Sequence, residues 1–334
     1  MAAQARLNEV ARTRSTAAEP RHGHVSVLGH GGFRRLSYLE WGPPKAPRTV
    51  ICVHGVSRMG RDFDVLAAAL AEAGARVIVP DLPGRGRSEW LASPAHYTDR
   101  AYTGALSTLI ARLDVELVDW IGTSLGGHLG MLMAAEHGSP ISRLVLNDFG
   151  ARVSAAALRR IGAYLSRRWR FESIEELEAH LRDIHEPFGQ LTDAQWKHLA
   201  HHSAARDPAG GFRFHFDPGI ARRFAIPIYM DIVLWHLWEK ITCPVLVLRG
   251  EDSDLLTTAT TNEMLERGPA AKLGRVSVVE IAECGHAPAL MDDQQIAVIK
   301  DFLQLPETSK SASRPGAAPG AKTSSVRLPL ARAS

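Results

Sequence analysis

The sequence predicts an α/β fold, with a mostly parallel central sheet of about eight strands, flanking helices and a helical cap inserted after the sixth strand. Short, nearly continuous runs of apolar and β-branched residues alternate with helical segments, as expected of strands buried on both faces of a parallel sheet. One long segment breaks this alternation, because its strand pattern disappears and its sequence becomes helical and aromatic. A chain of 334 residues can hold one large domain of this kind with an insertion.

The expected strands follow one another in a simple order. Two weaker strands, around residues 25–29 and 36–41, come first and are expected to form an antiparallel start to the sheet. The remaining strands are nearly continuous apolar runs, which favours a parallel arrangement covered by helices. These runs are residues 49–53, 76–80, 117–121, 143–146, 244–248 and 276–280.

The same patterns divide the chain into a core, a cap and two tails. Residues 22–149 and 240–305 are expected to form the core, and residues 150–239 the cap. Residues 1–21 are polar and aperiodic, and residues 306–334 are rich in Ser, Ala, Pro and Arg, so both are expected to be disordered. The cap aromatics should mostly pack inside it, but as a set they indicate an apolar acyl pocket. They are Trp169, Trp196, Phe212, Phe214, Phe216, Trp235 and Trp238.

Composition excludes several classes of protein. The 39 basic and 36 acidic residues give a formal charge of only +3, which argues against a nucleic-acid partner. Three widely spaced cysteines suggest neither a disulfide framework nor a metal knuckle and fit a reducing cytoplasm. No apolar run approaches the roughly 20 residues of a membrane span, and the first residues lack the apolar centre of a secretory signal. We therefore expect a cytoplasmic protein without a membrane partner.

The strongest chemical signal is Gly-Thr-Ser-Leu-Gly at residues 122–126, which follows a strand and opens a helix. A serine hydroxyl is a poor nucleophile in water, so it must be presented at a tight turn, where small neighbours let backbone approach closely. Ser124 is the predicted nucleophile. The N–H of Leu125, at the helix N-terminus, would face the developing oxyanion. The alternative is a glycine-rich turn with a capping serine.

A second oxyanion donor is predicted in the loop His54-Gly55-Val56-Ser57, which ends an earlier strand. This loop can fold over the carboxyl edge of the sheet and offer the N–H of Val56 to the same oxygen as Leu125. In the alternative interpretation Gly55 only makes a turn and His54 only braces the loop.

His286 is the predicted base. It lies in Cys284-Gly285-His286-Ala287-Pro288, just after the last strand and late in the chain, which is the right chain order for a serine and histidine on this kind of sheet. The chain has 15 histidines, and a lone histidine is usually a surface or packing residue, so only this position distinguishes His286.

The sequence offers several candidates for the carboxylate that would orient His286. The loop 249–256 follows a strand and precedes a helix, so its carboxylates could reach the histidine and fix its tautomer. Asp254 is the prediction and Asp252 the near alternative, because spacing cannot separate two acids in one loop. Asp148, at the end of the sixth strand, could also orient the histidine, although a helix cap or loop brace is the simpler interpretation.

By these residues the chain resembles the α/β-hydrolase family over roughly residues 25–305. Residues 81–88, Asp-Leu-Pro-Gly-Arg-Gly-Arg-Ser, look like the family's D-x-P-G-x-G-x-S loop, and residues 250–256 resemble its usual acid loop, which favours Asp254 or Asp252 over Asp148. Some members carry aspartate as nucleophile, whereas this chain has Ser124. The resemblance therefore implies an esterase, a lactonase, a carbon–carbon bond hydrolase or an acyltransferase.

Four arginines follow strand ends at one edge of the expected sheet and would suit a substrate that carries a carboxylate. Arg58 is the first candidate for substrate binding. The alternative is that these arginines pair with local acids such as Asp62 and Asp64, or face solvent. The four are Arg58, Arg61, Arg85 and Arg87.

The sequence thus predicts a serine hydrolase that cleaves a small-molecule carboxylic ester or related acyl bond through an acyl-enzyme. No metal or organic cofactor is called for, because the triad and the oxyanion donors supply the catalytic groups. Two alternatives stay open: a hydrolase of carbon–carbon bonds in diketo acids with the same triad, and a non-catalytic ligand receptor on the same fold. An apolar cap face could serve as a homodimer surface.

Overall fold

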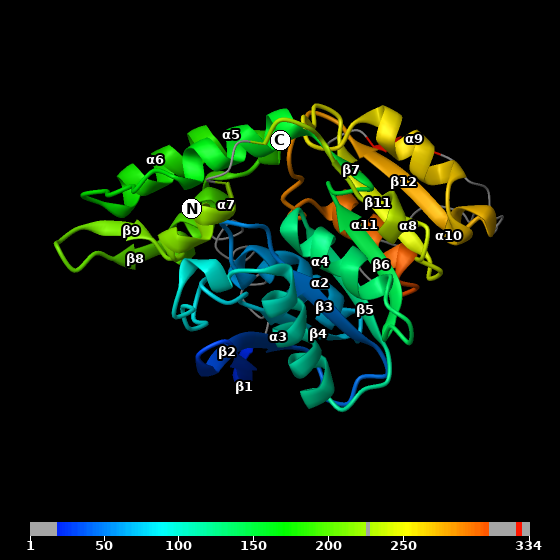
Figure 1. Cartoon of the computed structure of the whole chain (residues 1–334), viewed down its shortest axis with the longest axis horizontal. Coiled ribbons are helices and arrows are strands. Elements are labelled where there is room, and N and C mark those ends of the chain that lie inside the picture. The colour runs from blue at the N-terminus through cyan, green and yellow to red at the C-terminus, as the bar shows by residue number, and fades with distance from the viewer. Residues whose placement is uncertain (1–18, 225–227, 307–324, 329–334) are drawn as a thin grey trace, which may run out of the picture.

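The central sheet of the computed structural model runs in the order β1-β2-β4-β3-β5-β6-β11-β12-β13 (Figure 1). The structure describes residues 19–224, 228–306 and 325–328. β1 pairs with β2 and β2 with β4 in antiparallel fashion, and the other neighbours are parallel. The predicted mostly parallel sheet with an antiparallel start is confirmed. Its strands are β1 Arg21–Gly29, β2 Gly32–Trp41, β3 Thr49–Val53, β4 Arg76–Pro80, β5 Val118–Thr123, β6 Ile141–Asn147, β11 Val245–Gly250, β12 Val276–Ile281 and β13 Ser325–Leu328.

Strand β13 lies in a segment that the sequence predicts to be disordered. It pairs in parallel with β12, so the prediction is wrong for these four residues. Without β13 the outer edge of β12 would present unpaired backbone groups, and pairing satisfies them. The rest of the two predicted tails, residues 1–18, 307–324 and 329–334, lies outside the described residues.

Helices cover both faces of the sheet, and alternate residues of a strand enter different cores. On β3, Val50 and Cys52 pack towards α2 and α11, whereas Ile51 and Val53 pack towards α3 and α4. Full burial of one such side chain stabilises the fold by about 1.5–3 kcal/mol, which explains why these strands are apolar on both faces. The covering helices are α2 Asp64–Glu72, α3 Asp99–Arg112, α4 Leu125–Ala134, α9 Thr258–Glu266, α10 Pro269–Lys272 and α11 Asp293–Phe302.

Residues 150–239, which lie between β6 and β11 and which we call the cap segment, are mainly helical where the structure describes them. Ser154, Ser173 and Thr192 accept hydrogen bonds from backbone N–H groups in the first turns of α5, α6 and α7, which explains where these helices begin. In Figure 1, α5 and α6 lie on the side of the molecule opposite β1 and β2. The helices are α5 Ala155–Leu165, α6 Ile174–Ile184, η3 Glu186–Phe188, α7 Asp193–Ser203, η4 Pro218–Phe224 and α8 Trp235–Trp238.

Two short strand pairs also lie in the cap segment, and the sequence does not predict them. β7 Arg152–Val153 pairs with β10 Ile232–Val233, and β8 Ala204–Arg206 pairs with β9 Phe212–Phe214. Strands of two or three residues are too short for their alternation to be recognised. Among the residues that the structure describes, no helix combines the length and apolarity needed to cross a lipid bilayer.

The carboxyl ends of β3, β5, β6, β11 and β12 meet at one edge of the sheet, because these strands are parallel. This edge carries the loops in which the sequence places its candidate nucleophile, oxyanion donors, acids and base. In open α/β sheets this is the edge at which ligands bind.

Candidate active site

Ser124 lies at the sharp turn between β5 and α4. Its backbone has φ 51° and ψ −110°, a strained conformation for a residue other than glycine. The turn is so tight that a Cβ on Gly122 would collide with the backbone of Gly126, and one on Gly126 with the carbonyl of Val53. The chain therefore presents the serine at the N-terminus of α4, in the manner that the G-x-S-x-G pattern predicts.

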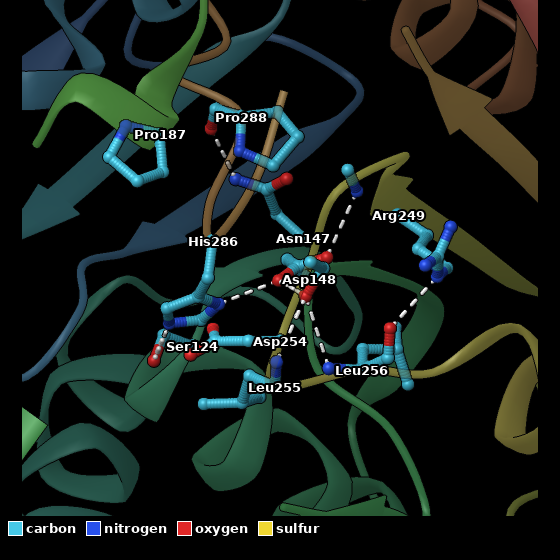
Figure 2. A network of polar contacts seen from close by, with 12 residues as sticks. Ser124, Asn147, Asp148, Pro187, Arg249, Asp254, Leu255, Leu256, His286 and Pro288 are labelled. Atoms are coloured by element: carbon cyan, nitrogen blue, oxygen red, sulfur yellow. Dashed lines mark hydrogen bonds and ion pairs between the residues drawn. The ribbon is translucent and has the colours of Figure 1, made fainter. Parts of the chain in front are cut away.

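Ser124, His286 and Asp148 form a continuous chain of hydrogen bonds (Figure 2). Nε2 of His286 lies 3.0 Å from Oγ of Ser124, and Nδ1 of His286 lies 2.6 Å from Oδ2 of Asp148. Asp148 is fully buried and His286 is 9% exposed. In such an arrangement the histidine can take the serine proton while the carboxylate fixes its tautomer and stabilises the imidazolium.

The prediction that Asp254 holds the imidazole is wrong in this structure. Asp254 is 45% exposed, and its two oxygens accept hydrogen bonds of 2.8 Å from Arg160 of α5. Asp252, the near alternative, is also exposed. Asp148, the acid that the sequence favours less, contacts His286 in their place.

The loop predicted to supply the acid instead holds Asp148 in place. The N–H of Gly250 donates to Oδ1 of Asp148 at 3.0 Å, and the hydroxyl of Ser253 donates to Oδ2 at 2.6 Å. The N–H of Asp148 donates to the carbonyl of Leu248 at 2.8 Å, which ties its backbone to β11. With His286 as a further partner, the buried carboxylate has the hydrogen bonds that its charge requires.

Asn147, the last residue of β6, anchors the loop that carries the histidine. Its Nδ2 atom donates to the carbonyl of Pro288 at 2.8 Å and to Oγ1 of Thr123 at 3.0 Å. The N–H of Gly285 donates to the carbonyl of Pro187 in the cap segment at 2.8 Å. One strand end thus positions the acid and the histidine loop together, and the cap segment supports the loop from the other side.

His54 orients the peptide that carries the N–H of Val56. Its Nε2 atom accepts from the N–H of Leu82 at 2.9 Å, so Nδ1 carries the proton and donates to the carbonyl of Gly55 at 2.7 Å. The C=O and N–H of a trans peptide point in opposite directions, so fixing this carbonyl also fixes where the N–H of Val56 points. Burial lowers the pKa of His54 to about 3, and the ring is neutral at pH 7. His54 therefore stabilises this loop, which is one of the roles that the sequence suggests for it.

Arg85 is held by backbone partners, which favours a structural role over the binding of a substrate carboxylate. Its side chain is fully buried, Nε donates to the carbonyl of Val56 at 2.9 Å, and Nη1 donates to the carbonyl of Pro83 at 2.8 Å. A guanidinium with these partners fixes the backbone of the predicted oxyanion loop.

Asp81 fixes the D-x-P-G-x-G-x-S loop from inside. Its carboxylate accepts from the N–H of Gly60 at 2.8 Å and from the N–H of Arg87 at 2.9 Å. Burial raises the pKa of Asp81 to about 6. The side chain of Arg87 is exposed. The motif therefore joins two loops at the sheet edge, and its acid is not part of the hydrogen-bonded chain of Ser124, His286 and Asp148.

Comparison with known proteins places this architecture in a family. Residues 50–299 match the alpha/beta hydrolase family. The chain belongs to this family. It is 43% identical over 297 residues to a protein of Cupriavidus necator named 3-hydroxybutyrate-oligomer hydrolase, covering 86% of this chain and 99% of that protein. The chain is therefore a hydrolase.

Solved structures agree with this assignment. A structure from Rickettsia typhi is 30% identical, with a TM-score of 0.79, over 87% of this chain and all of that one. An alpha/beta hydrolase from Novosphingobium aromaticivorans is 32% identical, with a TM-score of 0.75, over 86% of this chain and 99% of that one.

In this alpha/beta hydrolase, Arg58 lines the space beside Ser124 but already holds a carboxylate. Nε and Nη2 of Arg58 donate to the two oxygens of Asp62 at 2.6 and 2.8 Å. Arg61 lies against Asp64, with its Nε atom 2.6 Å from Oδ2. The predicted local pairing thus occurs for both arginines, and Arg58 additionally faces the serine.

Ser124 lines a small cavity of about 40 Å³, and a second cavity of about 30 Å³ shares Gly55 and Arg58 with it among its lining residues. The cap segment closes the first cavity with residues that sequence reasoning missed. Among them, the hydroxyl of Tyr164 is 2.8 Å from Oγ of Ser57, which joins the cap segment to the predicted oxyanion loop. No local pattern marks such residues, because they are defined by contacts across the fold. They are Arg160, Ile161, Tyr164, Ile184, His185 and Phe188.

Proposed function

We propose that this hydrolase is a serine esterase that cleaves short oligomers of 3-hydroxybutyrate, or closely similar hydroxyacid esters, through an acyl-enzyme. The observation that carries the proposal is the hydrogen-bonded chain from Ser124 through His286 to Asp148, with distances of 3.0 and 2.6 Å. The name of the relative from Cupriavidus necator supports the substrate class, because the two chains are 43% identical over 86% of this chain and 99% of the relative.

The first half of the reaction would form the acyl-enzyme. Oγ of Ser124 attacks the ester carbonyl carbon while Nε2 of His286 takes its proton, and the carbonyl oxygen becomes an oxyanion. The N–H groups of Val56 and Leu125 are the proposed donors to that oxyanion. The C–O bond then breaks, and the departing hydroxyl oxygen receives the proton from His286.

The second half would release the acid. Water loses a proton to Nε2 of His286 and attacks the acyl carbon, which forms the second tetrahedral intermediate. The bond between that carbon and Oγ of Ser124 then breaks, Oγ takes the proton back from Nε2 of His286, and the acid is released. Throughout, the carboxylate of Asp148 stabilises the charged imidazole. Its burial supports this role, because an ion pair is stronger where water is excluded.

The free carboxylate at one end of a hydroxybutyrate oligomer gives Arg58 a proposed role in substrate binding. Nε and Nη2 of Arg58 are occupied by Asp62, and Nη1 has no partner among the described residues, so it is the atom offered to a second carboxylate. Arg58 is 6% exposed, and a charge–charge contact in such a site is weakly screened.

The size of the cavity adds a condition to the proposal. A space of about 40 Å³ holds about one water molecule, whereas ligand pockets usually measure several hundred Å³. Substrate entry would therefore require α5 and η3 of the cap segment to move away from the serine.

Labelling with a fluorophosphonate tests the nucleophile. Stoichiometric modification of Ser124, read by mass spectrometry and abolished in Ser124→Ala, is the expected result. A folded wild-type protein that binds ligands but is not labelled would favour the ligand-receptor alternative over an esterase.

Substrate comparison tests the class. The linear dimer and trimer of 3-hydroxybutyrate should be hydrolysed with a higher kcat/KM than a vinylogous diketo acid; the reverse order would favour the carbon–carbon bond hydrolase.

Arg58→Gln should raise KM for the free-acid dimer about tenfold or more, the loss expected of one charge-assisted hydrogen bond, and change KM little for its methyl ester. Arg87→Gln, at an exposed position, is the matched control.

A further inference from the structure

A second group of chemically reactive side chains lies outside the triad, where the cap segment meets the core. Asp64 is the first residue of α2, and His198 and His202 belong to α7. One potential ligand atom from each of these three side chains lies within 4.8 Å of the others. We propose that Asp64, His198 and His202 bind a divalent transition-metal ion such as Zn²⁺.

The donor set fits such an ion. Imidazole nitrogen and carboxylate oxygen are the ligands that Zn²⁺ takes besides thiolate, and three protein ligands leave a fourth position for water. His198 and His202 are four residues apart on one helix, so they share a face and can converge on one ion. The spacing alone does not reveal the site, because the carboxylate comes from a distant part of the chain.

The surroundings of the buried Asp64 carboxylate also favour a bound metal ion. The residue is only 7% exposed, yet neither carboxylate oxygen has a hydrogen bond of good geometry among the described residues. Buried carboxylate oxygens are almost always satisfied, whereas the ion pairs of Asp64 with Arg61 and His198 leave both of its oxygens without a well-directed hydrogen bond. Nε2 of His198 lies 3.3 Å from Oδ2 of Asp64. The same nitrogen is 3.1 Å from the carbonyl oxygen of Arg61.

Arg61 is the group that a metal ion would displace. Its Nε atom is 2.6 Å from Oδ2 of Asp64, but neither atom makes a hydrogen bond of good geometry among the described residues. The side chain is 19% exposed, so the guanidinium can swing into solvent when an ion takes its place beside the carboxylate.

The proposed metal site lies where α7 of the cap segment contacts the core. α7 packs on η1 (Gly60–Phe63), the turn that leads into Asp64. Leu199 of α7 and Arg58 line the smaller cavity, which shares lining residues with the cavity at Ser124. A bound ion would therefore tie the cap segment to the loop that carries the proposed substrate-binding arginine.

The test uses the full-length protein freed of metal by chelation and dialysis. Titration with ZnCl₂ in a calorimeter should show one equivalent bound, and CoCl₂ should give the visible absorption of a protein-bound cobalt ion. At a hundredfold excess over Kd, Zn²⁺ should raise Tm by about 5 °C or more. None of these readouts involves hydrolysis, so their failure would leave the proposed function untouched, and failure of the esterase assay would leave the metal site untouched.

Variants decide whether the binding belongs to this cluster. His198→Gln and His202→Gln should each weaken Zn²⁺ binding at least tenfold and remove the Tm shift, and Asp64→Asn should do the same if it folds. His201→Gln, an exposed histidine of the same helix, should keep both. The proposal is overturned if wild type binds no stoichiometric Zn²⁺, or if the His201 variant loses as much as the His198 and His202 variants.

Discussion

Oδ2 of Asp148 lies 2.6 Å from Nδ1 of His286, although Asp148 leaves the sheet at the end of β6 and the loop expected to supply the acid follows β11. Both strand ends reach the same edge of the sheet, and β6 and β11 are direct neighbours. A carboxylate from either can therefore approach the histidine, and here the β11 loop contributes hydrogen-bond donors to the β6 acid.

Asp148→Asn should reduce kcat for ester hydrolysis by about 10³–10⁴-fold, because an amide cannot stabilise the imidazolium and can favour the wrong tautomer. Asp254→Asn should change kcat less than about threefold, since it breaks only an exposed pair with Arg160. Steady-state kinetics of the two variants, with circular dichroism as a check of folding, gives the comparison. Equal losses in both variants, or the larger loss in Asp254→Asn, would refute the assignment of the acid.

Ser253→Ala should lower both activity and stability. The hydroxyl of Ser253 donates to Oδ2 of Asp148 at 2.6 Å in a buried setting, and loss of a hydrogen bond to a charged group costs about 1.5–3 kcal/mol. We expect urea unfolding to show this loss and kcat to fall about tenfold with little change in KM, because the serine acts on the carboxylate and not on the substrate. Ser253→Thr, which keeps the hydroxyl, should recover part of kcat; no recovery in a folded variant would argue against a positioning role.

Arg85→Gln should slow catalysis although Arg85 is outside the proposed triad. Its Nε atom donates to the carbonyl of Val56, so the substitution frees the loop that carries a proposed oxyanion donor. A fall in kcat of about tenfold or more is expected in steady-state kinetics, with the exposed Arg87→Gln as control. An unchanged kcat in a folded Arg85→Gln protein would mean that the loop keeps its geometry without this contact.

Local patterns predict the parts of this site that local backbone geometry determines. The turn around Ser124 needs glycine on both sides of it, and those glycines are visible in the sequence. His286 follows the last strongly apolar strand, in the chain order expected of the base. The structure brings these two residues together, and their catalytic roles stay predictions.

The parts that were missed depend on contacts between distant residues. Ser253 contacts Asp148 across 105 positions of the chain, and Ser57 contacts Tyr164 across 107. Spacing cannot decide between carboxylates in two neighbouring loops; the position of Asp148 depends on its φ of 52° and on donors from the other loop. The arginines show the same limit. Asp62 and Asp64, the partners of Arg58 and Arg61, are near them in sequence. Sequence does not tell that Arg58 lines the cavity at Ser124.

The pH dependence of stability should carry a contribution from His54. Burial lowers its pKa to about 3 in the folded protein, against 6.5 as the ordinary value, so the unfolded chain binds a proton between these limits that the folded one does not. This contribution to stability is complete above pH 6.5 and is lost as pH falls towards 3. Between pH 6 and 4 it amounts to a slope of about 1.4 kcal/mol per pH unit. Urea unfolding at several pH values should show this slope reduced in His54→Gln, even though the variant is less stable at pH 7, and unchanged for the exposed His137→Gln. Equal slopes in wild type and His54→Gln would show that His54 titrates normally in the folded state.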